Sequence, residues 1–276
     1  MPTDPREPPS PPPQPFQRLP TQATWDDLVL PPDELAQLHA IVDRVVYLPR
    51  LRASADAAWS LQHAHGTSAL FVGASGTGKT LAAEVLAREL GLDLWRVDLS
   101  AVVSQYVGET EKNLARVFAA AQESGAILLF DDADALLGAR SEVKDSHDRY
   151  ANLEITDLLQ RLESHAGLAI LTTNMRHAID PAFMRRMTTI VHFPAPDAAC
   201  RERIWRRLLP ASADVEHLDV PRLARMDLTG GTIRDIATRA ACHAAAQATP
   251  ITMPLILEAA AAELRKLGRT PGAEHA

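Results

Sequence analysis

The sequence predicts an α/β protein, in which a parallel β-sheet core is followed by a small all-α lid domain. Two observations lead to this fold class. Short apolar segments alternate with amphipathic helical ones through the middle of the chain, an order typical of parallel sheets with helices on both sides. After Pro194 the strand-like segments stop, and only helical patterns follow.

Five apolar runs are short and almost continuous, as expected of strands that are buried on both faces of a sheet. These expected strands are Ala69–Val72, Leu92–Val97, Ala126–Phe130, Leu168–Leu171 and Thr189–Phe193. The helical patterns between them are Thr80–Leu90, Glu111–Glu123 and Tyr150–Glu163. Apolar residues spaced three and four apart between Leu35 and Val46 predict a further helix before the first strand, and a poorer one follows over Leu51–Ala64.

The expected domain organisation has four segments. Residues 1–24 form a disordered tail, because the first twenty residues hold nine prolines and almost nothing apolar; an extended partner-binding segment is the alternative for it. Residues 25–195 form the α/β domain, residues 196–270 the helical lid and residues 271–276 a second disordered tail. The helices expected in the lid are Ala198–Leu208, Val220–Ala224, Thr232–Ala246 and Met253–Leu267.

Composition excludes several classes of protein. A net charge of −7 argues against a surface for nucleic acids or acidic membranes, since phosphate neutralisation needs clustered lysine and arginine. Two cysteines, Cys200 and Cys242, are too few for a disulfide framework, which favours a reducing compartment. No apolar run approaches the roughly 18 residues that span a bilayer, and no secretion signal is present. We therefore expect a cytoplasmic protein with no membrane partner.

A glycine-rich segment between the first expected strand and the next helix carries the strongest chemical signal. Glycines let backbone amides approach phosphate oxygens closely, the lysine supplies positive charge, and the threonine hydroxyl suits Mg²⁺. The following helix directs its positive end at the same point. The residues expected to bind nucleotide here are Gly73, Ala74, Ser75, Gly76, Thr77, Gly78, Lys79, Thr80 and Leu81. The pattern predicts binding of ATP with Mg²⁺.

Two carboxylates follow the third expected strand. Asp131 could hold the metal together with Thr80, and Asp132 could face the γ-phosphate and activate water. The alternative is that Asp132 only caps a helix over Ala133–Leu137. The phosphate-binding pattern upstream favours the catalytic interpretation.

With Thr172-Thr173-Asn174 at the end of the fourth strand, the sequence from Trp25 to Leu267 resembles the AAA+ ATPases, and within them the AAA group. The resemblance implies an ATPase with the P-loop AAA+ core and helical lid. It implies that the entry segment, with Asp27 and Leu28, lies against adenine. It also implies that Asn174 senses the γ-phosphate and positions water.

Three further segments match the family. Ser104–Thr110 is similar to the AAA pore loop, so that Tyr106, Val107 and Gly108 would line the channel of a ring and grip a polypeptide; Tyr106 could instead pack locally. Asp180–Arg186 resembles the segment whose arginines enter a neighbouring subunit's site, which points to Arg185 and Arg186, unless they are a solvated basic pair. In Thr229–Asp235 the family pattern implies that Gly231 touches adenine and that Arg234 contacts phosphate.

Two departures from the family pattern affect the expected rate. The second carboxylate is Asp132 where relatives have glutamate, which shortens its reach by roughly 1.5 Å and suggests slow hydrolysis. The Pro-Gly found between the two arginines of many relatives is absent. The polar string between Gly138 and Arg149, with Tyr150–Glu154, resembles a compact bacterial AAA subgroup, some of whose members are encoded with contractile injection systems.

Three functions follow as hypotheses. The first is an ATPase ring, most simply a hexamer of identical chains, that remodels a protein substrate or assembly partner. The second is a slow ATP/ADP switch that regulates a partner assembly. The third, a nucleic-acid loader or helicase, is the weakest because the chain is acidic and has no basic module.

Overall fold

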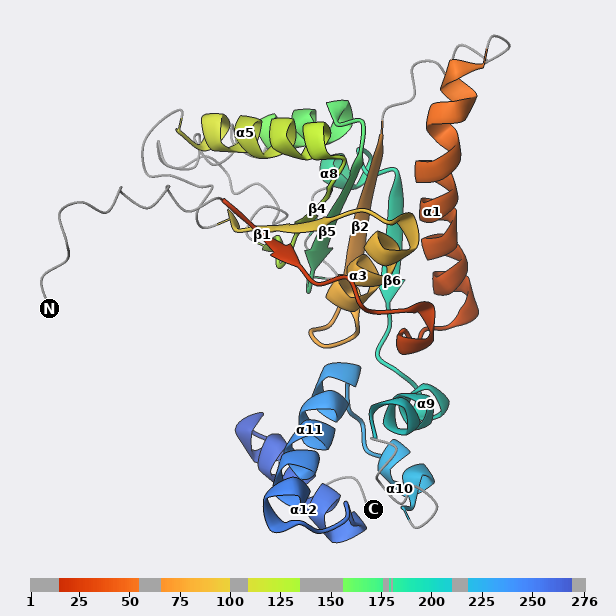
Figure 1. Ribbon diagram of the computed structural model, residues 1–276, viewed down its shortest axis with the longest axis vertical. Coiled ribbons are helices and arrows are strands. Elements are labelled where there is room, and N and C mark those ends of the chain that lie inside the picture. Colours follow the sequence, from red (N-terminus) through yellow and green to blue (C-terminus); the bar gives the residue numbers. More distant parts are fainter. Residues whose placement is uncertain are drawn as a thin grey trace, which may run out of the picture.

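The computed structural model describes residues 15–54, 66–99, 109–134, 156–175, 179, 181–209 and 218–269. These residues form a β-sheet flanked by helices and, beneath the carboxyl ends of its strands, a separate group of helices (Figure 1). The α/β fold class with a helical C-terminal part is confirmed. Residues 196–270 as a domain in their own right stay a prediction.

The sheet has six strands in the order β1-β3-β4-β5-β2-β6. Five of them run parallel, and only β1 is antiparallel, paired with β3 at one edge. The parallel strands are β2 Thr67–Gly73, β3 Leu94–Val97, β4 Ile127–Phe130, β5 Leu168–Thr173 and β6 Thr189–Phe193. All five lie where the apolar runs predicted them; β6 has the predicted ends, and the ends of the others differ by at most two residues.

The edge strand β1, Phe16–Leu19, was not expected. The prediction that residues 1–24 are disordered is therefore wrong for these four residues. The ring of Phe16 stacks on Trp95 with 4.1 Å between centroids and 5° between planes, and Leu19 packs against the apolar side of the sheet that carries α1 and α3. Flanking prolines at 15 and 20 are compatible with an edge strand, where a ladder donor is not required.

The central strands are buried on both faces because helices cover each side. On one face lie α5, Glu109–Ser124, and the helical residues 156–164; they pack on Leu70 and Val72 of β2. On the other face lie α1, Pro32–Ala53, and α3, Lys79–Leu90; they pack on Ala69 and Phe71. Alternate residues of one strand thus reach opposite sides, which explains why the predicted strands read as continuous apolar runs. α1 runs on to Ala53, so Leu51–Ala53 belong to this helix and do not begin a second one; residues 55–64 of the helix predicted over Leu51–Ala64 lie outside the described part of the chain.

The group of helices beneath the sheet, called the lid below, comprises α9 to α12. They are α9 Ala198–Leu208, α10 Val220–Ala224, α11 Gly230–Gln247 and α12 Met253–Lys266. Their core includes Trp205, Ile233, Ile236 and Ile256, each with no exposed surface. The side chains of Asp197, Asp219 and Thr229 accept hydrogen bonds from backbone amides at the starts of α9, α10 and α11.

The topology fixes the position of the site. The carboxyl ends of β2, β4 and β5 meet at one edge of the sheet, α3 begins there, and the start of α11 faces them from the lid (Figure 1). Crevices at the carboxyl ends of parallel strands are where open α/β sheets bind ligands. None of the described helices combines the length and apolar character needed to cross a membrane.

Candidate nucleotide-binding site

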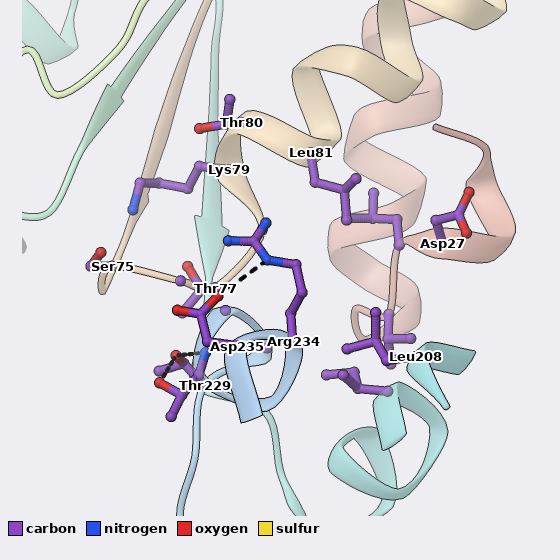
Figure 2. A pocket seen from close by; sticks show the side chains of 18 of the residues that line it. Asp27, Ser75, Thr77, Lys79, Thr80, Leu81, Leu208, Thr229, Arg234 and Asp235 are labelled. Atoms are coloured by element: carbon purple, nitrogen blue, oxygen red, sulfur yellow. Dashed lines mark hydrogen bonds and ion pairs between the residues drawn. The ribbon is translucent and has the colours of Figure 1, made fainter. Parts of the chain in front are cut away.

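A cavity of about 910 Å³ lies between the edge of the sheet and the lid. Its size is at the upper end of the range of small-molecule sites. Its walls come from the entry segment before α1, from the loop between β2 and α3, from the ends of β4 and β5, and from α9, α11 and α12. Figure 2 shows the loop residues above and the lid residues Thr229, Arg234 and Asp235 below.

The loop between β2 and α3 depends on close approaches that only glycine allows. Gly76 has a φ of +77° and Gly78 one of +102°. A Cβ atom added to Gly76 would lie 2.6 Å from Thr229 Oγ1 of the lid, and one added to Gly73 would lie 2.3 Å from the carbonyl oxygen of Phe193. The loop therefore passes between β6 and the lid and delivers the N-terminal amides of α3 to the cavity.

Lys79 is a buried cation at the first turn of α3. Its side chain is 7% exposed, and its ammonium donates hydrogen bonds to the Gly73 carbonyl (2.7 Å), the Ala74 carbonyl (3.0 Å) and Asn174 Oδ1 (2.8 Å). Burial lowers the pKa of Lys79, and the negative charges of Asp132 and Asp131 oppose this shift. The three acceptors are oxygens, the kind of partner that a phosphate group also offers.

Asp131 and Thr80 bring oxygen ligands together beside this lysine. The Thr80 hydroxyl donates to both carboxylate oxygens of Asp131 at 3.2 Å, and the Thr172 hydroxyl donates to Asp131 Oδ1 at 2.7 Å. Mg²⁺ binds oxygen ligands and is usually held by one or two carboxylates, with phosphates and waters completing its shell. A carboxylate and a hydroxyl at a phosphate-binding loop fit that ion.

Asp132 has an unusual backbone for a residue with a side chain. Its φ is +53°, and its amide donates to the Thr172 hydroxyl at 2.9 Å. Its carboxylate accepts a hydrogen bond from Asn174 Nδ2 at 3.1 Å. Left-handed conformations of non-glycine residues concentrate at functional sites. The alternative capping role concerns a helix over Ala133–Leu137 that extends beyond the described residues.

The entry segment reaches the cavity through the short 3₁₀ helix η1, Trp25–Asp27. Asp27 accepts hydrogen bonds from the amide (2.8 Å) and hydroxyl (2.7 Å) of Thr24, which hold the pKa of its carboxyl below the usual value. It also pairs with Arg207 of α9 at 2.7 Å, so the entry segment is tied to the lid. Leu28 is buried, and both Leu28 and Leu81 line the cavity.

The first turn of α11 closes on the loop. The Gly231 amide donates to the Gly76 carbonyl at 2.8 Å. Arg234 extends from α11 toward the start of α3 in Figure 2 and lies 3.6 Å from Asp235. Burial raises the pKa of Glu84 on α3, and the positive charge of Arg234 opposes that shift. Gly231 and Arg234 thus face the phosphate-binding loop from the lid.

Of the remaining predicted residues, the two arginines lie in the described part of the chain and are not among the residues that line this cavity. Arg185 and Arg186 follow α8, Pro181–Met184, and are exposed, with Arg186 Nε 3.3 Å from Glu163 Oε1. Tyr106, Val107 and Gly108 lie outside the described residues.

Sequence reasoning missed Arg207 in the cavity wall and Asp134 beside the cavity, and it gave no separate role to Thr229, the first residue of the predicted Thr229–Asp235 segment. Asp134 accepts a hydrogen bond from the backbone amide of Asn174. Its place three residues after Asp131 could have indicated a position near the site. Arg207 comes from the lid, far along the chain from its partner Asp27, and no local pattern marked it.

The loop from strand to helix, together with the carboxylates that follow β4, defines the class of P-loop nucleotide-binding proteins. Residues 69–195 match the family model described as "ATPase family associated with various cellular activities (AAA)". This match covers slightly less than half of the chain, agrees with the resemblance drawn from its motifs and supports nucleotide binding. The association with contractile injection systems stays a prediction.

The relatives in sequence point the same way. The chain is similar to an uncharacterized AAA family ATPase, y4kL, of Sinorhizobium fredii, with 37% identity over 132 residues, 47% of this chain and 39% of that protein. It is 31% identical over 184 residues to a proteasome-activating nucleotidase of Methanothermobacter thermautotrophicus, covering 63% of this chain and 45% of that protein. A cell division cycle protein 48 homolog of Archaeoglobus fulgidus is 29% identical over 188 residues, 66% of this chain and 26% of that protein. The chain thus spans less than half the length of these relatives.

Replacement of Gly76 by alanine tests the contact between loop and lid. The new methyl group would lie 2.6 Å from Thr229 Oγ1, and the left-handed backbone adds about 1–2 kcal/mol of strain. We expect ATP affinity, measured by calorimetry, to fall at least about tenfold, which corresponds to 1.4 kcal/mol. Gly91→Ala is the matched control, because Gly91 also has a positive φ, of +66°, but an added Cβ meets nothing within 4 Å. Equal affinities of the two variants would contradict the assignment.

Proposed function

We propose that this chain binds ATP together with Mg²⁺ and hydrolyses it to ADP and inorganic phosphate. The observation that carries the proposal is the hydrogen-bond chain Lys79–Asn174–Asp132, in which a buried cation and a carboxylate share one bridging amide. A phosphate-binding lysine, a metal-binding carboxylate and a water-positioning group within one cavity are what phosphoryl transfer to water requires. The AAA family match supports the same reaction.

Each residue has a distinct part in the proposed reaction. The ammonium of Lys79 exchanges its carbonyl partners for β- and γ-phosphate oxygens of ATP, and the α3 amides hold the same phosphates. Thr80 and Asp131 hold Mg²⁺, which when bound neutralises phosphate charge. Apolar surface for the adenine base of ATP comes from Leu28, Leu81, Ile204 and Leu208.

Asp132 and Asn174 act on the attacking water. Asp132 orients the water and accepts its proton, the water oxygen forms a bond to the γ-phosphorus, and the bond to the bridging oxygen of ADP breaks. Asn174 fixes the Asp132 carboxylate through its amide group, 3.1 Å away.

Two substitutions separate binding from hydrolysis. Lys79→Ala removes the charge that meets the phosphates, so ATP affinity should fall by about tenfold to a hundredfold or more. Asp132→Asn keeps the shape and tolerates the positive φ, so affinity should persist while turnover falls at least about a hundredfold. Asp157→Asn is the control, because Asp157 pairs with Arg161 away from the cavity. Calorimetry and phosphate release measure both effects; retained affinity in the first variant or undiminished turnover in the second would refute the proposal.

We further propose that the active form is a ring of identical chains, most simply a hexamer. The exposed Arg185 and Arg186 do not line their own cavity, as arginines acting on a neighbour's site would require. A guanidinium supplied from a neighbour stabilises charge on the transferred phosphoryl group, so hydrolysis would depend on assembly. The similarity to AAA family proteins and to proteins named as proteasome-activating nucleotidases supports assembly.

Mixed rings test this arrangement. The double variant Arg185→Ala, Arg186→Ala should bind ATP normally but hydrolyse it about a thousandfold more slowly, the lower end of the effect of an arginine supplied in trans. The Asp132→Asn chain is inactive for a different reason. Mixing the two inactive chains should restore part of the turnover, because an intact cavity then meets intact arginines of a neighbour. Mass measurement with ATP, with ADP and without nucleotide follows assembly, and a mixture that stays inactive while forming mixed rings would rule the arginines out.

The remodelling of a protein substrate in the ring's channel is the finer part of the proposal, and it rests on the match of Ser104–Thr110 to the AAA pore loop. If Tyr106 grips unfolded chains, casein should stimulate ATP turnover in the wild type. The same stimulation is expected in Tyr106→Phe, because phenylalanine keeps the aromatic side chain. Tyr106→Ala should lose this stimulation while its ATP affinity is unchanged. Full stimulation of Tyr106→Ala would exclude the gripping role.

One observation favours the slow switch as a second candidate. The carboxylate of Asp132 is one methylene shorter than a glutamate, and in this structure it bonds to Asn174. Such a base reaches less far toward the attacking water, and misplacement by 1 Å costs about a hundredfold in rate. Turnover well below one per second in assembled rings would favour the switch over the remodelling machine.

A further inference from the structure

Asp134 forms a hydrogen-bond cluster with the end of β5. Its Oδ1 accepts from the Thr173 hydroxyl at 2.5 Å and from the Asn174 backbone amide at 2.9 Å. The Thr173 hydroxyl in turn accepts from the Met175 amide at 3.0 Å. Thr173 has no exposed surface, so this anchor is fixed in the sheet. One carboxylate oxygen therefore anchors both the Thr173 side chain and the Asn174 backbone where β5 ends.

Asn174 depends on that path more than a packed residue would. Its side chain is exposed and bridges Lys79 Nζ, at 2.8 Å from Oδ1, to the Asp132 carboxylate, at 3.1 Å from Nδ2. An exposed amide is not held by surrounding atoms, so its direction follows from its two hydrogen bonds and from its backbone. A shift of the backbone at residue 174 would move both bonds together.

We propose that Asp134 is a positioning residue for ATP hydrolysis, which holds the Asn174 backbone so that its amide reaches Lys79 and Asp132 at once. The inference rests on the proposed ATPase function of the same cavity. Asp134 itself does not line the cavity and touches neither Lys79 nor Asp132 through a hydrogen bond between described residues. The positioning effect acts through the Asn174 backbone, and the negative charge of Asp134, which raises the pKa of Lys79, is the competing contribution.

Two substitutions at this position separate the acceptor from the charge. Asp134→Asn keeps a carbonyl oxygen that can accept from both Thr173 and Asn174, but it removes the negative charge. Asp134→Ala removes both. A role that depends on position is rescued by asparagine, whereas a role of the negative charge in raising the pKa of Lys79 is not.

Kinetics of the full chain form the first test. For Asp134→Ala we expect kcat to fall about tenfold to a hundredfold, the effect of a misplacement of about 1 Å, with KM and ATP affinity within about threefold of the wild type. For Asp134→Asn we expect kcat within about threefold of the wild type. Thr173→Val should resemble Asp134→Ala, and Thr173→Ser should resemble the wild type. An unchanged melting temperature and retained ATP binding in the variants exclude unfolding as the cause of a lower kcat.

A second readout needs no hydrolysis. Deuterium exchange of the backbone amides of residues 173–175 should be faster in Asp134→Ala than in the wild type and in Asp134→Asn, because the alanine variant lacks the acceptor. Unchanged exchange in Asp134→Ala would overturn the inference whatever the activity. A wild-type kcat in Asp134→Ala, or an equal loss in both variants, would also overturn it. If the wild-type chain itself fails to hydrolyse ATP, the proposed function falls, while faster exchange would still support the anchor.

Discussion

The buried positive charge of Lys79 is the constraint on which the rest of the site depends. A lysine that is 7% exposed needs acceptors, because an unpaired charge away from water is costly. The strand-to-helix loop supplies two carbonyls, and β5 supplies the amide oxygen of Asn174. β5 must therefore lie beside β2, as it does, and the parallel order of the sheet places both strand ends at the same edge. The charge links the sheet topology to the chemistry.

The second dependence is the fit of the lid against the loop. Gly76 and Gly231 approach so closely that a Cβ on either would lie within 3 Å of an atom across the gap. The amide of Gly231 donates its hydrogen bond to the Gly76 carbonyl, and Arg207 pairs with Asp27 at the opposite side of the cavity. The lid is thus attached at both ends of the site. A displacement of the loop between β2 and α3 on nucleotide binding would therefore move the start of α11, since closely packed elements transmit displacement.

Much of the fold followed from local patterns. Continuous apolar runs predicted all five parallel strands, because burial on both faces leaves no polar alternation, and the helical patterns after Pro194 predicted α9 to α12. β1 could not be predicted, because its stability comes from the ring of Phe16 stacking on Trp95, a contact between segments far apart in the chain. One local motif predicted the residues of the loop between β2 and α3. Arg207 could not be predicted in this way, because its role depends on the packing of the lid beside the entry segment. Pairings of this kind leave no periodic trace in the sequence.

The replacement of glutamate by Asp132 is easier to understand with the backbone in view. A residue with φ of +53° already holds its side chain in a direction that an ordinary strand end would not allow, and aspartate is among the residues that tolerate this conformation. The Thr172 hydroxyl stabilises the turn by accepting from the Asp132 amide while it donates to Asp131. The shorter carboxylate of Asp132 thus occurs together with a left-handed backbone at this residue and with the side-chain amide of Asn174, which fixes its oxygen. Side-chain length alone is then a poor measure of catalytic capacity here, because the position of the carboxylate is set by the whole strand end.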